Sequence, residues 1–166
     1  MGNAANVKMG VCNVSFGGSD LGYTKGYVKL NYTIETTEKT VDQEDAPIDE
    51  ILTSQKFEVK VPLAEQDLAR LKDLLPGSTL VTDGTKKKLT LSGAAGTSLI
   101  ALAKELVVAP VGGDANDAVT LHHAVPVPSI DFAYEKDNVR VFEVTFKAMK
   151  GANGFVTFGD KTATGV

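Results

Sequence analysis

The sequence has few of the residues from which enzymes and disulfide-bonded domains build their sites. Its 166 residues include no Trp, four Tyr, two His and one Cys. The single Cys12 cannot form an intramolecular disulfide, and a zinc site made of several cysteines is excluded. His122 and His123 are adjacent, so on a strand they point to opposite faces and cannot chelate one ion together. We therefore expect a protein that is not an enzyme and that uses no metal and no cofactor.

Long apolar runs and an excess of basic residues are also absent. Lys104 and Glu105 interrupt the longest apolar stretch, which is too short to span a membrane. The first six residues lack the basic start and apolar run of a secretory signal. With 17 basic and 21 acidic residues the net charge is −4, which disfavours tight nucleic-acid binding through phosphate neutralisation. We expect a chain that is made in a cytoplasm and does not insert into a membrane.

Residues that favour strands and turns are abundant. Val and Thr number 19 and 16, and there are 16 Gly. β-Branched residues favour strands, and glycines favour turns. The length suits a single domain, residues 1–166, and no shift in composition divides it. The predicted fold class is mainly β, a sandwich or barrel with one flanking helix and a long loop between two strands.

The strongest periodic signals lie in the first half of the chain. Apolar and polar residues alternate over 27–36 and again over 55–63, which predicts two half-buried strands. Residues 64–75 carry leucines at helical spacing, and Pro76-Gly77 ends the predicted helix. We interpret these leucines as core residues: Leu68, Leu71, Leu74 and Leu75.

The remaining elements are shorter. Strands are predicted at 11–16, 78–82, 87–92, 118–127, 139–148 and 155–158. Residues 98–108 fit either a helix or a strand, and the tail over 160–166 is expected to be loose.

The connection between the two long strands, residues 37–54, is unusual. Five acidic residues and no basic residue lie within 42–50. Structureless loops longer than about 12–15 residues are usually functional or mobile. One interpretation is a solvated loop that its acids keep soluble, and the other is a protruding arm that orders itself against another subunit.

Three stretches in the first half of the chain carry a resemblance to a known protein family. The first, Asp20 to Gly26, leads into the first long strand. The second runs from Thr36 to Gln43 and on from Ala46 to Ile51, and the third, Phe57 to Glu65, joins the second strand to the helix. Over residues 20–65 the chain resembles the tail tube proteins (major tail proteins) of long-tailed bacteriophages, and the later strand order is compatible with that family.

The resemblance implies a structural virion protein. Six copies would close into a ring, each giving four strands to an inner β-barrel, and the rings would stack into the hollow tail tube that conducts phage DNA into the host. It also implies contacts with the tape-measure, tail-terminator and baseplate or tip proteins. In this family the long loop typically reaches the adjacent ring, and its candidates here are Val41, Asp42, Glu44, Asp45, Ile48, Asp49, Glu50 and Ile51.

In such a tube the polar faces of the alternating strands would line the lumen, with the apolar faces packed inside each subunit. A wall that guides DNA without holding it needs few fixed phosphate contacts. The lumen candidates are Lys29, Asn31, Thr33, Glu35, Glu58, Lys60, Glu143, Thr145 and Lys147. They include three Lys and three Glu, so a strongly acidic wall follows only if other acids, such as Asp137, complete it.

Two other functions compete with this hypothesis. One is the tube subunit of a type VI secretion system or a related contractile injection machine, which resembles the phage fold and would be told apart by neighbouring genes. The other is a monomeric β-sandwich binding module, for example for carbohydrate. The absence of Trp and the four Tyr argue against that module, since such sites favour exposed aromatic side chains.

Overall fold

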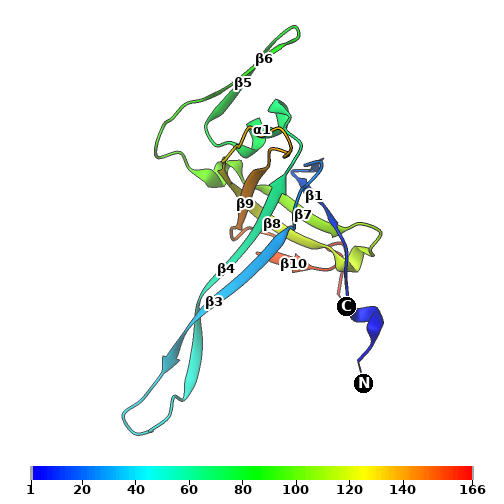
Figure 1. The fold of residues 1–166 in the computed structure, drawn as a ribbon. Coiled ribbons are helices and arrows are strands. Elements are labelled where there is room, and N and C mark those ends of the chain that lie inside the picture. The colour runs from blue at the N-terminus through cyan, green and yellow to red at the C-terminus, as the bar shows by residue number, and fades with distance from the viewer. Residues whose placement is uncertain (1, 166) are drawn as a thin grey trace.

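One antiparallel sheet organises the computed structural model, which describes residues 2–165 (Figure 1). Its strands are ordered β2-β1-β7-β8-β9-β4-β3, and β10 pairs with β8 off this path. A separate hairpin is formed by β5 and β6. The strands are β1 (Cys12–Phe16), β2 (Ser19–Asp20), β3 (Lys29–Lys39), β4 (Asp49–Leu63), β5 (Ser78–Asp83), β6 (Lys86–Leu91), β7 (Lys104–Pro110), β8 (Val119–Ser129), β9 (Phe142–Ala148) and β10 (Val156–Phe158).

Helical structure is sparse. The one α-helix is α1 (Leu68–Leu74), and three 3₁₀ turns complete the elements of residues 2–165: η1 (Ala4–Asn6), η2 (Leu99–Leu102) and η3 (Ala115–Asp117). The predicted mainly β class with one helix is therefore confirmed. No helix among the described residues is long and apolar enough to cross a bilayer.

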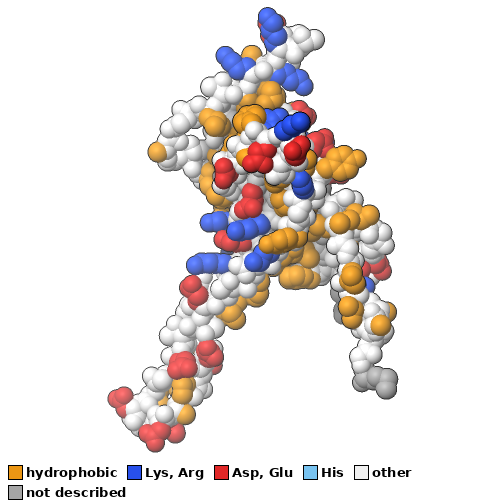
Figure 2. Space-filling model, in the orientation of Figure 1, with side chains coloured by type: hydrophobic (Ala, Val, Ile, Leu, Met, Phe, Trp, Pro, Cys, Tyr) orange, Lys and Arg blue, Asp and Glu red, His pale blue; other side chains and the backbone are white. Residues whose placement is uncertain are grey.

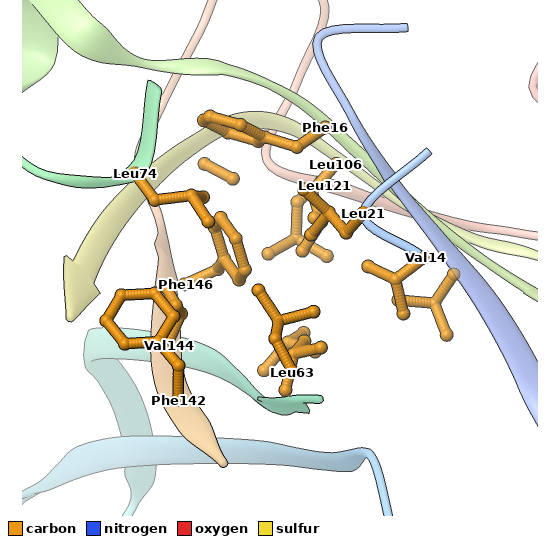
Figure 3. Packing of buried hydrophobic residues seen from close by; sticks show 14 of the residues in the cluster. Val14, Phe16, Leu21, Leu63, Leu74, Leu106, Leu121, Phe142, Val144 and Phe146 are labelled. Atoms are coloured by element: carbon orange, nitrogen blue, oxygen red, sulfur yellow. The ribbon is translucent and has the colours of Figure 1, made fainter. Parts of the chain in front are cut away.

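The sheet curls until its distant strands meet across a common core (Figure 3). Phe16 of β1 packs on Phe146 of β9 with ring centroids 5.0 Å apart, although β7 and β8 lie between these strands in the sheet. The interior consists of apolar side chains from alternate positions of its strands, because successive side chains point to opposite faces. The fully or almost fully buried members include Val14, Val59, Val61, Leu106, Leu121, Phe142 and Val144.

α1 closes one side of this core and is shorter than predicted. Leu74 and Leu75 are buried and Leu71 packs against them, whereas Leu68 is only half-buried. The predicted start at residue 64 is wrong, because the Ala64 N–H donates to the Tyr23 carbonyl at 2.8 Å, a contact with the segment before β3 and not with a helical turn. Asp67 instead caps the helix by accepting from the Ala69 N–H at 3.3 Å.

The segment predicted as a loop over 37–54 is mostly strand. β3 continues to Lys39 and β4 begins at Asp49, so the two strands form one long hairpin whose connection is residues 40–48. Thr and Ile residues beyond the core keep the alternation needed for pairing, from Glu35↔Ser54 to Lys39↔Asp49. We call residues 36–52 the arm.

Two further segments complete the comparison with the sequence predictions. Of the two alternatives for residues 98–108, the strand is found from Lys104 onward as β7, and the preceding residues form only the short 3₁₀ turn η2. The tail has no regular element over residues 160–165, and Lys161 forms an ion pair with Glu105. Asp160 accepts hydrogen bonds from the Thr162 hydroxyl and N–H, which lower the pKa of its carboxyl below the ordinary value.

We expect Phe146→Ala to lower the free energy of unfolding by about 3–5 kcal/mol, because it empties a fully buried site that contacts Phe16. Tyr27→Ala is the control and should change stability by less than about 0.5 kcal/mol, since Tyr27 is exposed. Urea denaturation of the monomer measures both. Equal effects of the two substitutions would contradict this assignment of the core.

Candidate functional site

Three neighbouring strands, β3, β4 and β9, present a continuous polar face. Directly opposed residues of antiparallel strands share a face. Lys29 lies opposite Lys60, which lies opposite Thr145, and this forms one row across the three strands. The next row is formed by Asn31, Glu58 and Lys147.

All nine residues predicted to line a lumen lie on this one face. Seven are exposed, and Glu58 and Thr145 are half-buried. The opposite face of the same strands is the core, where Val59, Val61 and Val144 are fully buried. We call the nine residues the polar face: Lys29, Asn31, Thr33, Glu35, Glu58, Lys60, Glu143, Thr145 and Lys147.

The charges of the polar face are mixed. Lys147 lies 3.9 Å from Glu58, and Lys56 lies 3.4 Å from Glu35. Lys56 pairs with Thr33 and shares this face, although it is not among the nine predicted residues. The alternation over 55–63 already placed Lys56 with Glu58 and Lys60. Asp137 lies outside these strands in an exposed segment, so it does not make the polar face acidic.

β3 ends the sheet with an unpaired edge. Its eleven residues are all exposed, and the strand pairs only with β4 within the described chain. An exposed edge of this length offers a row of free N–H and C=O groups to another strand.

The edge of β8, on the other side of β9 and β4, differs from the β3 edge. The Met149 N–H donates to the His123 carbonyl at 2.7 Å, so His123 and every second residue after it direct their backbone groups toward β9. Pro126 and Pro128 therefore face the other edge, where β7 pairs no further along β8 than Ala124. That edge has carbonyl acceptors but lacks two N–H donors, because proline has none.

The arm extends the hairpin away from the body (Figure 1). A β-bulge at Thr53 shifts the register between Glu35 and Thr36, and the Thr53 hydroxyl donates to the Glu35 carbonyl at 3.0 Å. The bulge brings Leu52 to the face that carries Ile34. Both side chains are about half exposed, so the core face continues outward as an uncovered apolar stripe.

Residues predicted for an inter-ring loop divide between the turn and the start of β4. Those in the connection are Val41, Asp42, Glu44, Asp45 and Ile48, and those paired in the arm are Asp49, Glu50 and Ile51. Ile51 lies opposite Thr37 and Asp49 opposite Lys39.

The body end of the β3–β4 hairpin, opposite the arm, is held by two of the sequence stretches that carried the family resemblance. Glu65 accepts from the Tyr23 N–H at 3.3 Å and pairs with Arg70 at 2.7 Å. Gly22, with a φ of +85°, makes room for this carboxylate, since a Cβ there would lie 2.2 Å from a Glu65 oxygen. Thr24 also forms a bridge with Leu63 at the end of β4.

The two histidines and the cysteine are engaged in packing contacts. His122 Nε2 lies 2.7 Å from the Thr157 hydroxyl, and the His123 ring fills the space where Gly151 would carry a side chain. Burial raises the pKa of the Cys12 thiol, which makes it a weaker nucleophile. Among residues 2–165, no three His, Cys, Asp or Glu side chains gather closely enough to hold a metal ion.

Two open grooves flank the hairpin of β3 and β4. One, of about 680 Å³, lies between residues 7–12 and the start of β3 and has mainly apolar walls. The other, of about 460 Å³, lies between residues 52–55 of β4 and the 150–155 loop. Neither groove contains a nucleophile paired with a base.

Comparison with known proteins leaves the function to be argued from this geometry. No protein-family model matches the sequence, and no curated protein matches it either.

We expect Cys12 to react with iodoacetamide at pH 8 more slowly than a cysteine placed at the exposed position 82. The raised pKa leaves less thiolate at Cys12, and the thiolate is the reactive form. The comparison uses the wild-type chain and a Cys12→Ser, Thr82→Cys variant, and unfolding in urea should remove the difference. Equal rates in the folded proteins would contradict the burial argument.

Proposed function

We propose that the chain is a structural subunit of a bacteriophage tail tube, which assembles into six-membered rings that stack into a hollow conduit for DNA. The observation that carries this proposal is the polar face, uncovered on three strands whose other side is a dry core. A solvated polar face is ordinary in a soluble antiparallel sheet, but here it lies beside an eleven-residue strand edge that the described chain leaves unpaired. A hollow assembly accounts for both features, because its strands pair between copies and its inner wall must be wet while each subunit keeps its own core.

The sheet supplies the strands that such a wall needs. β8, β9, β4 and β3 are consecutive neighbours, and they form a unit of four strands. Six such units would make a barrel of about 24 strands, and barrels of 16–18 strands already enclose an aqueous channel. Contact between β3 of one copy and β8 of the next is head-to-tail, the kind of interface that closes rings.

Pro126 and Pro128 shape this proposed contact. The β8 edge accepts hydrogen bonds at its carbonyls but donates none at the two prolines, so the neighbouring β3 must supply the N–H groups. Two β8 edges that met would both lack these donors. The prolines thus disfavour β8–β8 pairing and leave a β3 edge as the better partner.

The mixed charge of the polar face suits DNA as passing cargo. A row of basic residues alone would hold phosphates and resist movement, because binding strength grows with the number of phosphates neutralised. Here Glu35 and Glu58 lie beside Lys56 and Lys147, which shields part of the positive charge. The partners implied are other copies of the chain and the tape-measure, tail-terminator and baseplate or tip proteins of the virion.

Electron microscopy of the purified chain at rising concentration tests the proposal. We expect hollow rings, or tubes made of stacked rings, with the polar face on the inner wall. A chain that remains strictly monomeric at high concentration and in the presence of tail-assembly partners would contradict the proposal.

We also expect the arm to be dispensable for folding but required for stacking. Replacing residues 37–51 by Asn-Gly joins Thr36 to Leu52 through a favourable two-residue hairpin turn. The removed residues are exposed, apart from a half-buried Val41, so the free energy of unfolding should change by less than about 1 kcal/mol.

Rings of this shortened chain should form but fail to stack in electron micrographs. A chain with two residues inserted between the exposed Lys136 and Asp137 is the control, and it should stack normally. Normal tubes from the shortened chain would contradict the role of the arm.

A further inference from the structure

A second hairpin projects from the molecule at the end opposite the arm. β5 and β6 extend beyond α1 in Figure 1, while the tip of the arm lies at the other extreme of the body. The β5–β6 hairpin touches the body mainly near its base, where the half-buried Leu80 and Leu89 pair with each other and Leu89 packs against the core. Its outer half is exposed.

The two projections carry opposite charge. Lys86, Lys87 and Lys88 lie in succession on β6, with Asp83 as the one acid of the hairpin. Residues 40–50 of the arm hold five acids and no base. Figure 2 shows the blue side chains of the β5–β6 hairpin at one end of the molecule and the red side chains of the arm tip at the other.

These charges have no ion-pair partners among the described residues. The ion pairs of residues 2–165 lie elsewhere, and none includes Lys86, Lys87, Lys88 or an acid of residues 40–50. The two ends are too far apart to meet in one copy. Each charged projection is therefore left for a contact outside its own chain.

Apolar side chains accompany the charges on both projections. Val81 lies opposite Lys88 on the outer face of the β5–β6 hairpin and is 50% exposed. Ile48 and Ile51 are exposed to the same degree near the arm tip. Each surface thus pairs an apolar patch with charges of one sign, which is the composition of a surface that docks by contact and is oriented by charge.

We propose that the acidic arm tip of one copy docks on the basic β5–β6 hairpin of a second copy of this chain. The inference rests on the proposed assembly into stacked rings and names the surface that receives the arm. Because the two surfaces differ and lie at opposite ends, the contact repeats without closing and adds copies along an axis. Its strength should fall as salt rises, since exposed charge pairs are screened.

Charge reversal tests the pairing directly. One variant, K86E/K87E/K88E, makes both projections acidic, and the other, D42K/E44K/D45K, makes both basic. Neither variant alone should form tubes at the concentration at which the wild type does. The concentration that each needs should be higher by about tenfold or more, equivalent to about 1.4 kcal/mol. Rings of the two variants mixed together should stack again, because each arm then finds a hairpin of opposite charge.

The control variant is K8E/K136E/K161E, which changes the net charge equally at exposed lysines in segments outside both projections. It should stack like the wild type. Circular dichroism and thermal unfolding verify that every variant is folded, and electron microscopy counts rings and tubes separately.

The outcomes separate the two claims. Wild-type rings that never form overturn the proposed tube subunit. Wild-type tubes that form equally well after either charge reversal overturn the docking of arm on hairpin and leave the tube subunit standing. Failure of the mixed variants to stack also overturns the docking, since it would show that the charges act without pairing.

Discussion

The alternation of apolar and polar side chains along β3, β4 and β9 is the constraint on which the rest of the structure depends. The apolar set, including Phe57, Val59 and Phe146, fixes the register of these strands, because a slip of one residue would turn each set to the wrong side. Once that register is set, the polar set has to lie on the other face. The site is thus a consequence of the same packing that makes the fold stable.

This two-faced sheet leaves surfaces that a monomer does not satisfy. β3 has an unpaired edge, and the apolar stripe that begins in the core continues past Ile34 to Leu52 on the arm. Both features gain from contact with another chain, the edge by backbone hydrogen bonds and the stripe by removal from water. The prolines of β8 and the opposite charges of the two hairpins then limit how copies can meet.

Much of this arrangement was predictable from the sequence because it depends on period-two patterning. The polar face was found residue by residue in segments far apart in the chain, and only the pairing of strands was needed to unite them. The arm was read as a loop because its acids and its Pro47 obscured the alternation from Thr36 to Lys39. The helix start was misplaced because a long-range hydrogen bond from Ala64 to Tyr23 overrides the helical pattern. The β-bulge at Thr53 has no signal in the sequence.

The most direct test of the central claim is the accessibility of the polar face in the assembled protein. A Cys12→Ser, Thr33→Cys variant places one thiol on this face. In assembled tubes a small maleimide should label position 33, while a maleimide on a bulky polymer should label it only in the dissociated chain. Equal labelling of position 33 by the bulky reagent in tubes and in the dissociated chain would contradict a polar face that lines the channel.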